Sequence, residues 1–209
     1  METIKTRLSR GKRRPIAGRD EILAAAHNLG AREGWKAVTI RSVAQELGYT
    51  SPLLYEHFHD KEDLLTQIAV DGLRRLEARL AEQLPTDHRA AAVSMVERYW
   101  TFMLEHTQLY RLLNGMDGVP IDKTVVGAAA QSLCNLVADA VRPLLGENAG
   151  QADGQTLADE LWALLHGMAA LYMDRVAPFD LARVINTALT LIEGARMRKD
   201  AYPRPGSMK

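Results

Sequence analysis

The chain has 209 residues, of which 47% are apolar and 25% charged, and its formal net charge at pH 7 is zero. This composition is that of an ordinary globular protein, with enough apolar material for one large domain or for a small domain joined to a larger one. Because Cys134 is the single cysteine, an intramolecular disulfide and a zinc site made of several cysteines are excluded.

The pattern of apolar residues predicts an all-α fold. No segment alternates apolar and polar residues with a β-branched bias, whereas Ala, Leu, Arg and Glu recur throughout. No apolar run approaches the length that a membrane-spanning helix needs, so we expect no membrane partner. The charged N-terminus lacks the apolar core of a signal peptide, which makes the cytoplasm the expected location.

The zero net charge conceals a basic N-terminal segment. Residues 1–75 carry 13 Lys or Arg against 10 Asp or Glu, and most of this excess lies in the first nineteen residues. Gly11 and Pro15 interrupt this stretch, which holds little that can pack. We therefore expect residues 1–17 to form a disordered basic arm.

A first helix is predicted from about Gly18–Asp20 to Gly34, with Ile22, Ala26 and Leu29 on its inward face. After a short connection, a second helix begins behind Thr39, whose hydroxyl is placed to accept a bond from an otherwise unpaired backbone N–H. Its apolar residues fall at i, i+3, i+4 and i+7, which is one face of a helix. These residues are Ile40, Val43, Ala44 and Leu47.

Gly48 follows this second helix and is suited to the left-handed conformation that ends helices. A third helix is expected to start with Ser51 as its cap and Pro52 at its first helical position. Leu54 and Phe58 point inward from it, which leaves its other residues largely outside. Two short helices joined by a turn with a glycine, the second with a polar face, form the helix-turn-helix arrangement, whose second helix enters the DNA major groove.

The segment resembles the DNA-binding domain of the tetracycline-repressor (TetR) family. The resemblance covers roughly Arg19 to Leu76, and the sequence departs from the usual family pattern at Tyr49 and Leu53. It implies a dimeric, DNA-binding transcriptional regulator with a helical C-terminal domain. The resemblance is carried by Thr39, Val43-Ala44, Gly48, Leu54-Tyr55, His57-Phe58 and Lys61-Glu62.

The resemblance and the helix positions together give a set of expected DNA contacts. Arg41 is expected to bind guanine or a phosphate. The alternative is that Arg41 is only an exposed surface arginine without a DNA contact. Tyr55 and His57 are expected at phosphates and sugars, with the alternative that Tyr55 covers the small core. Lys61 is expected at a phosphate near a helix N-terminus. The full set is Arg41, Thr50, Ser51, Pro52, Leu53, Tyr55, His57 and Lys61.

The N-terminal end of the third helix is poor in hydrogen-bonding groups, since only Thr50 and Ser51 offer them. We therefore expect Arg41 and the shape of the DNA to carry much of the sequence specificity. In the basic arm, Lys12, Arg13 and Arg14 are expected either to stay solvated or to follow the phosphate backbone or minor groove.

The rest of the chain predicts a helical body, for about nine helices in all. We expect a DNA-binding domain at 18–65, a regulatory and dimerisation domain at 66–200, and a disordered tail at 201–209. An exposed loop is predicted at 146–155 because it is rich in Gly, Asn and Asp. The predicted body helices run from Asp60 to near Pro85, Asp87–His106, Gln108–Asn114, Asp122–Leu145, Thr156–Asp174 and Pro178–Lys199.

The last two predicted helices are apolar over more than one face. A helix of this kind must be covered on two sides, which favours a two-fold dimer. The family resemblance implies the same, because its last two helices usually form a four-helix dimer interface. The spacing Trp162…His166-Gly167 also resembles a TetR C-terminal type named for its Trp, His and Gly residues.

The sequence contains none of the common catalytic or metal-binding motifs. His57 and His59 are two residues apart and do not face each other on a helix. His106, His166 and Cys134 stand alone in apolar helices, which is typical of core residues. We expect no enzyme activity, metal or other cofactor.

The body is instead expected to bind a small, mainly apolar effector in a pocket with a few polar anchors. The alternative is that the pocket candidates are only core residues, which periodicity does not distinguish. The candidates are Trp100, Met103, Tyr110, Trp162, His166 and Tyr172.

The leading hypothesis is therefore a homodimeric repressor that binds a palindromic operator in double-stranded DNA and releases it when it binds a ligand. One alternative is a nonspecific or architectural DNA-binding protein that depends on its basic arm. Another is an all-α enzyme or carrier that retains a DNA-binding head.

Overall fold

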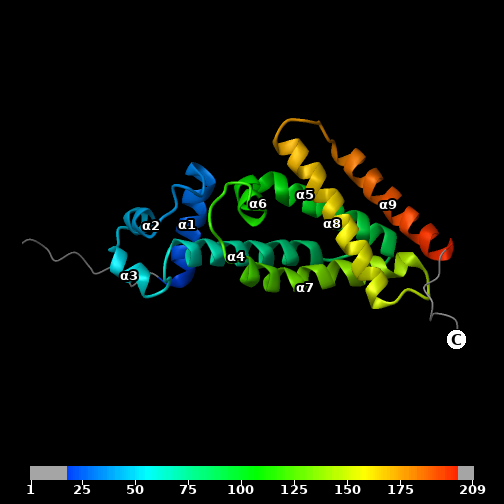
Figure 1. Cartoon of the computed structure of the whole chain (residues 1–209), viewed down its shortest axis with the longest axis horizontal. Coiled ribbons are helices and arrows are strands. Elements are labelled where there is room, and N and C mark those ends of the chain that lie inside the picture. Colours follow the sequence, from blue (N-terminus) through cyan, green and yellow to red (C-terminus); the bar gives the residue numbers. More distant parts are fainter. Residues whose placement is uncertain (1–17, 202–209) are drawn as a thin grey trace, which may run out of the picture.

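The computed structural model describes residues 18–201, and this part of the chain contains only helices (Figure 1). The all-α prediction is thus confirmed. The predicted arm contacts Lys12, Arg13 and Arg14 lie outside the described residues. The elements are α1 (Arg19–Glu33), α2 (Ile40–Leu47), α3 (Ser51–Tyr55), α4 (Lys61–Ala81), α5 (His88–Glu105), α6 (Thr107–Leu113), α7 (Lys123–Val141), the 3₁₀ helix η1 (Arg142–Leu145), α8 (Gln151–Met173) and α9 (Leu181–Ala201).

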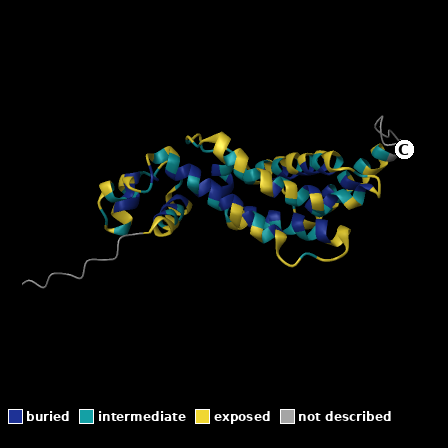
Figure 2. Cartoon of the chain, turned by 90° about the horizontal axis from the view of Figure 1, so that it is seen from below, coloured by how far each residue is buried: buried dark blue, intermediate teal, exposed yellow. Residues whose placement is uncertain are grey.

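The helices form an elongated molecule with a small head at one end (Figure 1). The head consists of α1, α2 and α3, and α4 runs from it lengthwise into the body. There α4 packs against α5 and α7, α7 packs against α8, and α8 packs against α9. Buried residues continue from the head along α4 into the body, so the two parts share one hydrophobic core (Figure 2).

The two ends of α2 are set by local hydrogen bonds. The Thr39 hydroxyl accepts from the Ser42 N–H at 3.0 Å, and the Ser42 side chain accepts from the Thr39 N–H at 2.9 Å, which forms a capping box. Gly48 ends α2 with φ of 71°, as predicted. The N-cap of α3, however, is Thr50 rather than Ser51, and it makes no side-chain capping bond.

The prediction of a loop at 146–155 was wrong for the second half of this segment, because α8 (Gln151–Met173) begins there. The Asp153 carboxylate accepts a hydrogen bond from the Gly150 N–H at 3.0 Å, which stabilises the first turn of the helix. Gly154 faces α7, where an added Cβ would lie 2.8 Å from the Ala138 carbonyl oxygen. Gly154 therefore allows α8 to pack closely against α7. The Gly, Asn and Asp content of residues 146–155 had indicated a loop instead.

The expectation that no apolar segment reaches membrane-spanning length was also wrong. By length and composition alone, the segment Lys123–Leu145 is long and apolar enough to cross a membrane. Leu133, Ala138 and Val141 of this segment are buried in the core. Its other side exposes Gln131, Ser132, Asn135 and Asp139, a polar face that is unfavourable in lipid.

Candidate nucleic-acid interface and ligand cavity

The recognition helix α3 is held by two anchors. Leu54 and Phe58 are 0% and 1% exposed, and burying two such side chains stabilises the head by roughly 1.5–3 kcal/mol each. Tyr55 lies between them in sequence and projects outward with 54% of its surface exposed, so it does not cover the small core. The side chain of Tyr55 is therefore accessible on the surface of the head, and its contact with DNA stays a prediction.

Two neighbours that were expected outside are partly packed. Leu53 and His57 are half-buried, and the His57 Nε2 atom is buried without a hydrogen-bond partner among the described residues. Leu53 belongs to α3, which packs against α2, and His57 lies in the turn that follows α3. A contact of His57 with DNA stays a prediction.

The remaining base-reading candidates lie at the exposed edge of the head. Arg41 is exposed in the first turn of α2. At the N-terminal end of α3, Thr50 and Pro52 are exposed and Ser51 is half-buried. The exposed side chains among them are accessible to DNA, and their contacts with it stay predictions.

Lys61 has an intramolecular partner that the sequence did not indicate. Its Nζ donates a hydrogen bond to the Lys36 carbonyl at 3.0 Å, which ties the start of α4 to the connection between α1 and α2. Partial burial lowers the pKa of the Lys61 ammonium. Because an ammonium group has three N–H donors, two stay free for a phosphate.

Arg19 is a further basic residue beside the recognition helix that the sequence reasoning did not select. Its guanidinium carbon lies 5.2 Å from the centre of the Phe58 ring, in a cation–π arrangement. This contact places a positive charge next to the end of α3. The only sequence signal was its position directly after the basic arm.

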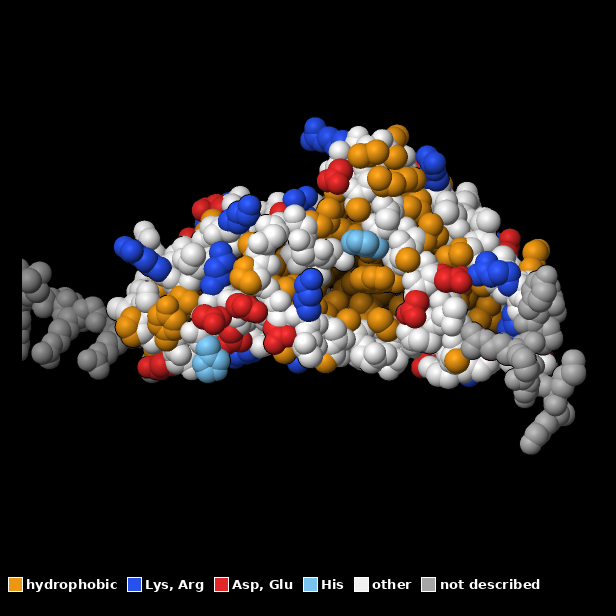
Figure 3. Space-filling view, viewed as in Figure 1, with side chains coloured by type: hydrophobic (Ala, Val, Ile, Leu, Met, Phe, Trp, Pro, Cys, Tyr) orange, Lys and Arg blue, Asp and Glu red, His pale blue; other side chains and the backbone are white. Residues whose placement is uncertain are grey.

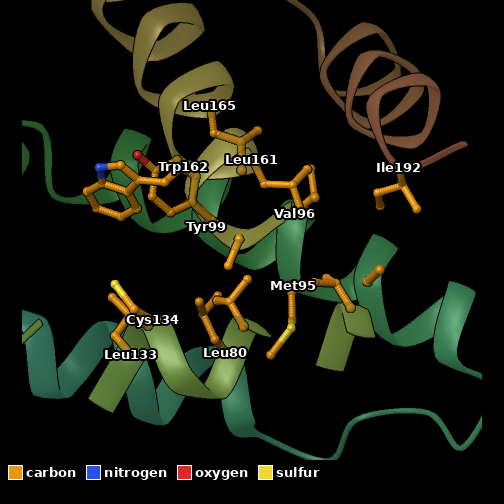
Figure 4. A pocket seen from close by; sticks show the side chains of 14 residues that line it. Leu80, Met95, Val96, Tyr99, Leu133, Cys134, Leu161, Trp162, Leu165 and Ile192 are labelled. Atoms are coloured by element: carbon orange, nitrogen blue, oxygen red, sulfur yellow. The ribbon is translucent and has the colours of Figure 1, made fainter. Parts of the chain in front are cut away.

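The body contains an apolar cavity between α4, α5, α7, α8 and α9, seen from outside as a hollow in the surface (Figure 3). The volume of the cavity is only about 60 Å³. The cavity is therefore narrow. It is lined by Leu80, Ala92, Met95, Val96, Tyr99, Leu133, Cys134, Val137, Val141, Ala158, Leu161, Trp162, Leu165 and Ile192 (Figure 4).

Of the six predicted pocket residues, only Trp162 lines this cavity. Trp100 and Tyr172 instead form an edge-to-face pair with ring centres 5.6 Å apart. Met103 is 1% exposed and belongs to the core. A ligand contact of these residues stays a prediction, but the structure does not bring all six together.

Tyr110 and His166 form a polar pair near the Tyr99 end of the cavity. The Tyr110 hydroxyl lies 2.5 Å from His166 Nδ1 and 3.3 Å from the His166 carbonyl. Burial raises the pKa of Tyr110 to about 12 and lowers the pKa of His166. Burial, followed by the proximity of Tyr110, raises the pKa of Tyr99 well above its ordinary value. The directions of these three pKa shifts all favour neutral side chains.

Cys134, which was expected to be a core residue, lines the cavity together with Tyr99. Tyr99 packs edge-to-face on Trp162, with ring centres 5.8 Å apart. Burial raises the pKa of the Cys134 thiol, and the negative charge of nearby Asp159 raises it further. Among residues 18–201, no three His, Cys, Asp or Glu side chains are grouped to hold a metal ion.

Comparison with known proteins identifies the family. Residues 22–68 match the profile of bacterial regulatory proteins of the tetR family, and residues 92–191 match a tetracyclin repressor-like C-terminal domain. The chain is 30% identical over 165 residues to the uncharacterized HTH-type transcriptional regulator Rv0681 of Mycobacterium tuberculosis, covering 76% of this chain and 71% of that protein. It is 27% identical to the HTH-type transcriptional activator FasR of Mycolicibacterium smegmatis, covering 68% and 70%.

A solved structure shows the same fold. The crystal structure of BioQ with its double-stranded DNA operator aligns with a TM-score of 0.66 at 19% identity, covering 87% of this chain and 99% of that one. The BioQ structure shows the shared fold, and the family assignment rests on the two matched segments and the mycobacterial relatives. The chain belongs to the tetR family of bacterial regulatory proteins and is a helix-turn-helix transcriptional regulator that binds DNA.

Proposed function

We propose that this regulator is a repressor, which binds a palindromic operator as a homodimer and leaves it when a small, mainly apolar molecule enters the cavity. The observation that carries the proposal is the course of α4. Its first residue, Lys61, is fixed to the head, and Leu80, near its last turn, lines the cavity. One helix of roughly 30 Å thus connects the two sites.

The proposed dimer uses α8 and α9. Trp162, Leu171 and Tyr172 of α8 are 40%, 43% and 38% exposed, and Met197 of α9 is 70% exposed. Large apolar side chains exposed on adjacent helices mark a surface that another chain can cover. A two-fold partner there would present two α3 helices, as a palindromic operator requires.

The proposed release follows from the small size of the cavity. The cavity volume of about 60 Å³ is far below the roughly 300–1,000 Å³ of most small-molecule sites. A ligand must therefore move the lining helices apart, and Leu80 belongs to α4. Displacement of α4 changes the separation of the two heads, which has to match about 34–36 Å between successive major grooves.

In this proposal the DNA contacts are made from Arg41, the N-terminal end of α3, Tyr55, His57 and Lys61. The BioQ structure, which has an operator bound, supports placing the same fold on duplex DNA. Because bacterial chromosomal DNA lies in the cytoplasm, the protein would act there.

The test is selection of bound duplexes from a random pool, followed by binding measurements on the selected and on scrambled sequences. We expect an enriched palindrome, bound at least about a thousandfold more tightly than a scrambled duplex at physiological salt. Arg41→Ala should reduce that ratio, whereas Arg89→Ala in the body should leave it unchanged. No enrichment, together with equal affinity for all duplexes, would instead support a nonspecific DNA-binding protein.

A further inference from the structure

A second hollow lies at the junction between the head and the body. It is an open groove of about 470 Å³, which falls within the roughly 300–1,000 Å³ of most small-molecule sites. One wall is α1 of the head, and the other consists of α4 and the residue that joins α5 to α6 (Figure 1). The residues that line this junction groove are Asp20, Leu23, Ala24, His27, Asn28, Asp71, Arg75 and His106.

The charged side chains of the junction groove are not paired within the described part of the chain. The guanidinium of Arg75 makes no ion pair or hydrogen bond with any residue of 18–201, and the same holds for the carboxylates of Asp20 and Asp71. Asp71 and Arg75 are four positions apart on α4, where side chains are neighbours on the helix surface. A small ligand in the groove can therefore reach a free cation and a free carboxylate together.

The two histidines of the junction groove add no charge near neutral pH. Burial lowers the pKa values of His27 and His106, and the positive charge of Arg75 lowers both further. Asp71 opposes this effect on His27 without reversing it. At pH 7.5 both imidazoles are therefore neutral, and each offers one hydrogen-bond donor and one acceptor. The charges that a ligand meets in the groove are one positive and two negative side chains.

This arrangement of charges favours a ligand that carries both signs. A simple anion would meet Arg75 but also two carboxylates, and a simple cation would meet the carboxylates but also the guanidinium. In a zwitterion, the carboxylate accepts the paired N–H donors of Arg75 while the ammonium group donates to Asp71. A metal ion is not favoured, because no three His, Cys, Asp or Glu side chains within residues 18–201 are grouped to hold one.

We infer that the junction groove binds a free α-amino acid as a second effector of DNA binding. An α-amino acid carries its carboxylate and its ammonium group on one carbon atom, which suits Arg75 and Asp71 on successive turns of α4. The neutral imidazoles and the Asn28 amide offer further hydrogen bonds to the bound molecule. The ligand contacts α1 of the head and α4 at the same time, so its affinity depends on the position of the head. The inference goes beyond the proposed function, because it concerns another site and a polar ligand.

Thermal unfolding of the full-length protein at pH 7.5, with each standard L-amino acid in turn at about 10 mM, tests the ligand class. At least one amino acid should raise the unfolding midpoint by about 3 °C, because a ligand of the folded state stabilises it. By isothermal titration calorimetry, that amino acid should bind at least about tenfold more tightly than its α-hydroxy acid, which lacks the ammonium group, and than its amide, which lacks the carboxylate. The absence of any stabilising amino acid, or equal binding of either analogue, overturns the inference.

Variants on α4 test the location. Arg75→Gln and Asp71→Asn should each weaken binding of that amino acid at least about tenfold, because each removes one charged partner. Arg74→Gln is the matched control, since Arg74 is the adjacent exposed arginine and does not line the groove. It should bind within about twofold of the unchanged protein. Binding that survives Arg75→Gln, or that Arg74→Gln weakens equally, overturns the inference.

Operator binding with and without the saturating amino acid tests the effector role. Because the ligand contacts the head and α4 together, the Kd for the operator should change by at least about fivefold, the lower end of typical allosteric coupling. An unchanged Kd, with the amino acid bound, overturns the effector role.

Discussion

The indole Nε1 of Trp35 donates a hydrogen bond to the Gln108 carbonyl at 2.6 Å, across 73 positions of sequence. Trp35 follows α1 in the head, whereas Gln108 belongs to α6 in the body, and the indole is 1% exposed. A buried, hydrogen-bonded tryptophan at this junction fixes the head against α6. The head therefore has a second connection to the body besides α4.

Gly30 should be intolerant of a side chain because of this tryptophan. A Cβ at position 30 would lie 2.2 Å from the Trp35 ring, so Gly30→Ala should lower the free energy of unfolding by about 1–3 kcal/mol. Gly127→Ala is the control, because a Cβ added at this helical glycine would have no other atom within 4 Å. This change should raise the free energy of unfolding by up to about 1 kcal/mol. Urea unfolding measures both, and similar effects of the two changes would refute the packing argument.

Arg98 should stabilise the cavity end of α4. Its Nη1 donates to the carbonyls of Arg79, Leu80 and Glu82, which are otherwise unpaired at the helix end. Arg98→Met should therefore reduce the free energy of unfolding by about 1.5–3 kcal/mol and weaken ligand binding, since Leu80 lines the cavity.

The matched control for Arg98→Met is Arg89→Met. Arg89 lies 3.7 Å from Glu193 in an exposed ion pair, which contributes about 0–1 kcal/mol. Thermal unfolding and ligand titration of both variants give the comparison. If Arg89→Met were as harmful as Arg98→Met, loss of a positive charge rather than loss of the helix cap would explain the result.

Lys61 should contribute to DNA affinity without reading sequence. Lys61→Ala should weaken binding to the selected operator and to scrambled duplexes by a similar factor, and reduce the slope of log affinity against log salt by about one. Lys123→Ala is matched, because Lys123 is likewise the first residue of a helix but lies in the body. Fluorescence anisotropy at several salt concentrations measures the slopes, and an unchanged slope in Lys61→Ala would exclude a phosphate contact.

The proposed dimer should be sensitive to a charge on α8. Leu171→Glu should give a monomer of 23.2 kDa in light scattering, whereas the unchanged protein should have twice that mass. Leu104→Glu in α5 is matched in exposure, since Leu104 and Leu171 are both 43% exposed, and it should stay dimeric. A dimeric Leu171→Glu would place the interface on another surface.

Acid should destabilise the junction between head and body. Burial lowers the pKa values of His27 and His106 below the ordinary 6.5, and nearby Arg75 lowers both further. The unfolded chain therefore binds more protons than the folded chain once the pH falls below about 6.5, so stability should decrease from there downward and stay unaffected above it. The two rings lie 6.3 Å apart, which adds repulsion when both are charged.

The double variant His27→Gln, His106→Gln tests this pH dependence. Its unfolding midpoint should fall less steeply than that of the unchanged protein between pH 7 and pH 5. Urea unfolding at each pH gives the two curves. Parallel curves would show that other groups cause the loss of stability in acid.

The head could be predicted from the sequence because its elements are set by local contacts. Thr39 and Ser42 cap α2 within one turn, Gly48 ends it, and Leu54 and Phe58 were correctly expected inside. The family resemblance depended on these same positions. The Ser51 cap was displaced by one residue, since both Thr50 and Ser51 are good capping residues and the local pattern does not separate them.

The cavity was decided by tertiary structure alone. Periodicity shows which face of a helix is buried, but not whether the neighbouring helices fill the space beside that face. Tyr99 and Trp100 are adjacent and both buried, yet Tyr99 lines the cavity and Trp100 packs on Tyr172. Consecutive helical residues point about 100° apart, so their roles depend on the packing of five helices from distant parts of the sequence.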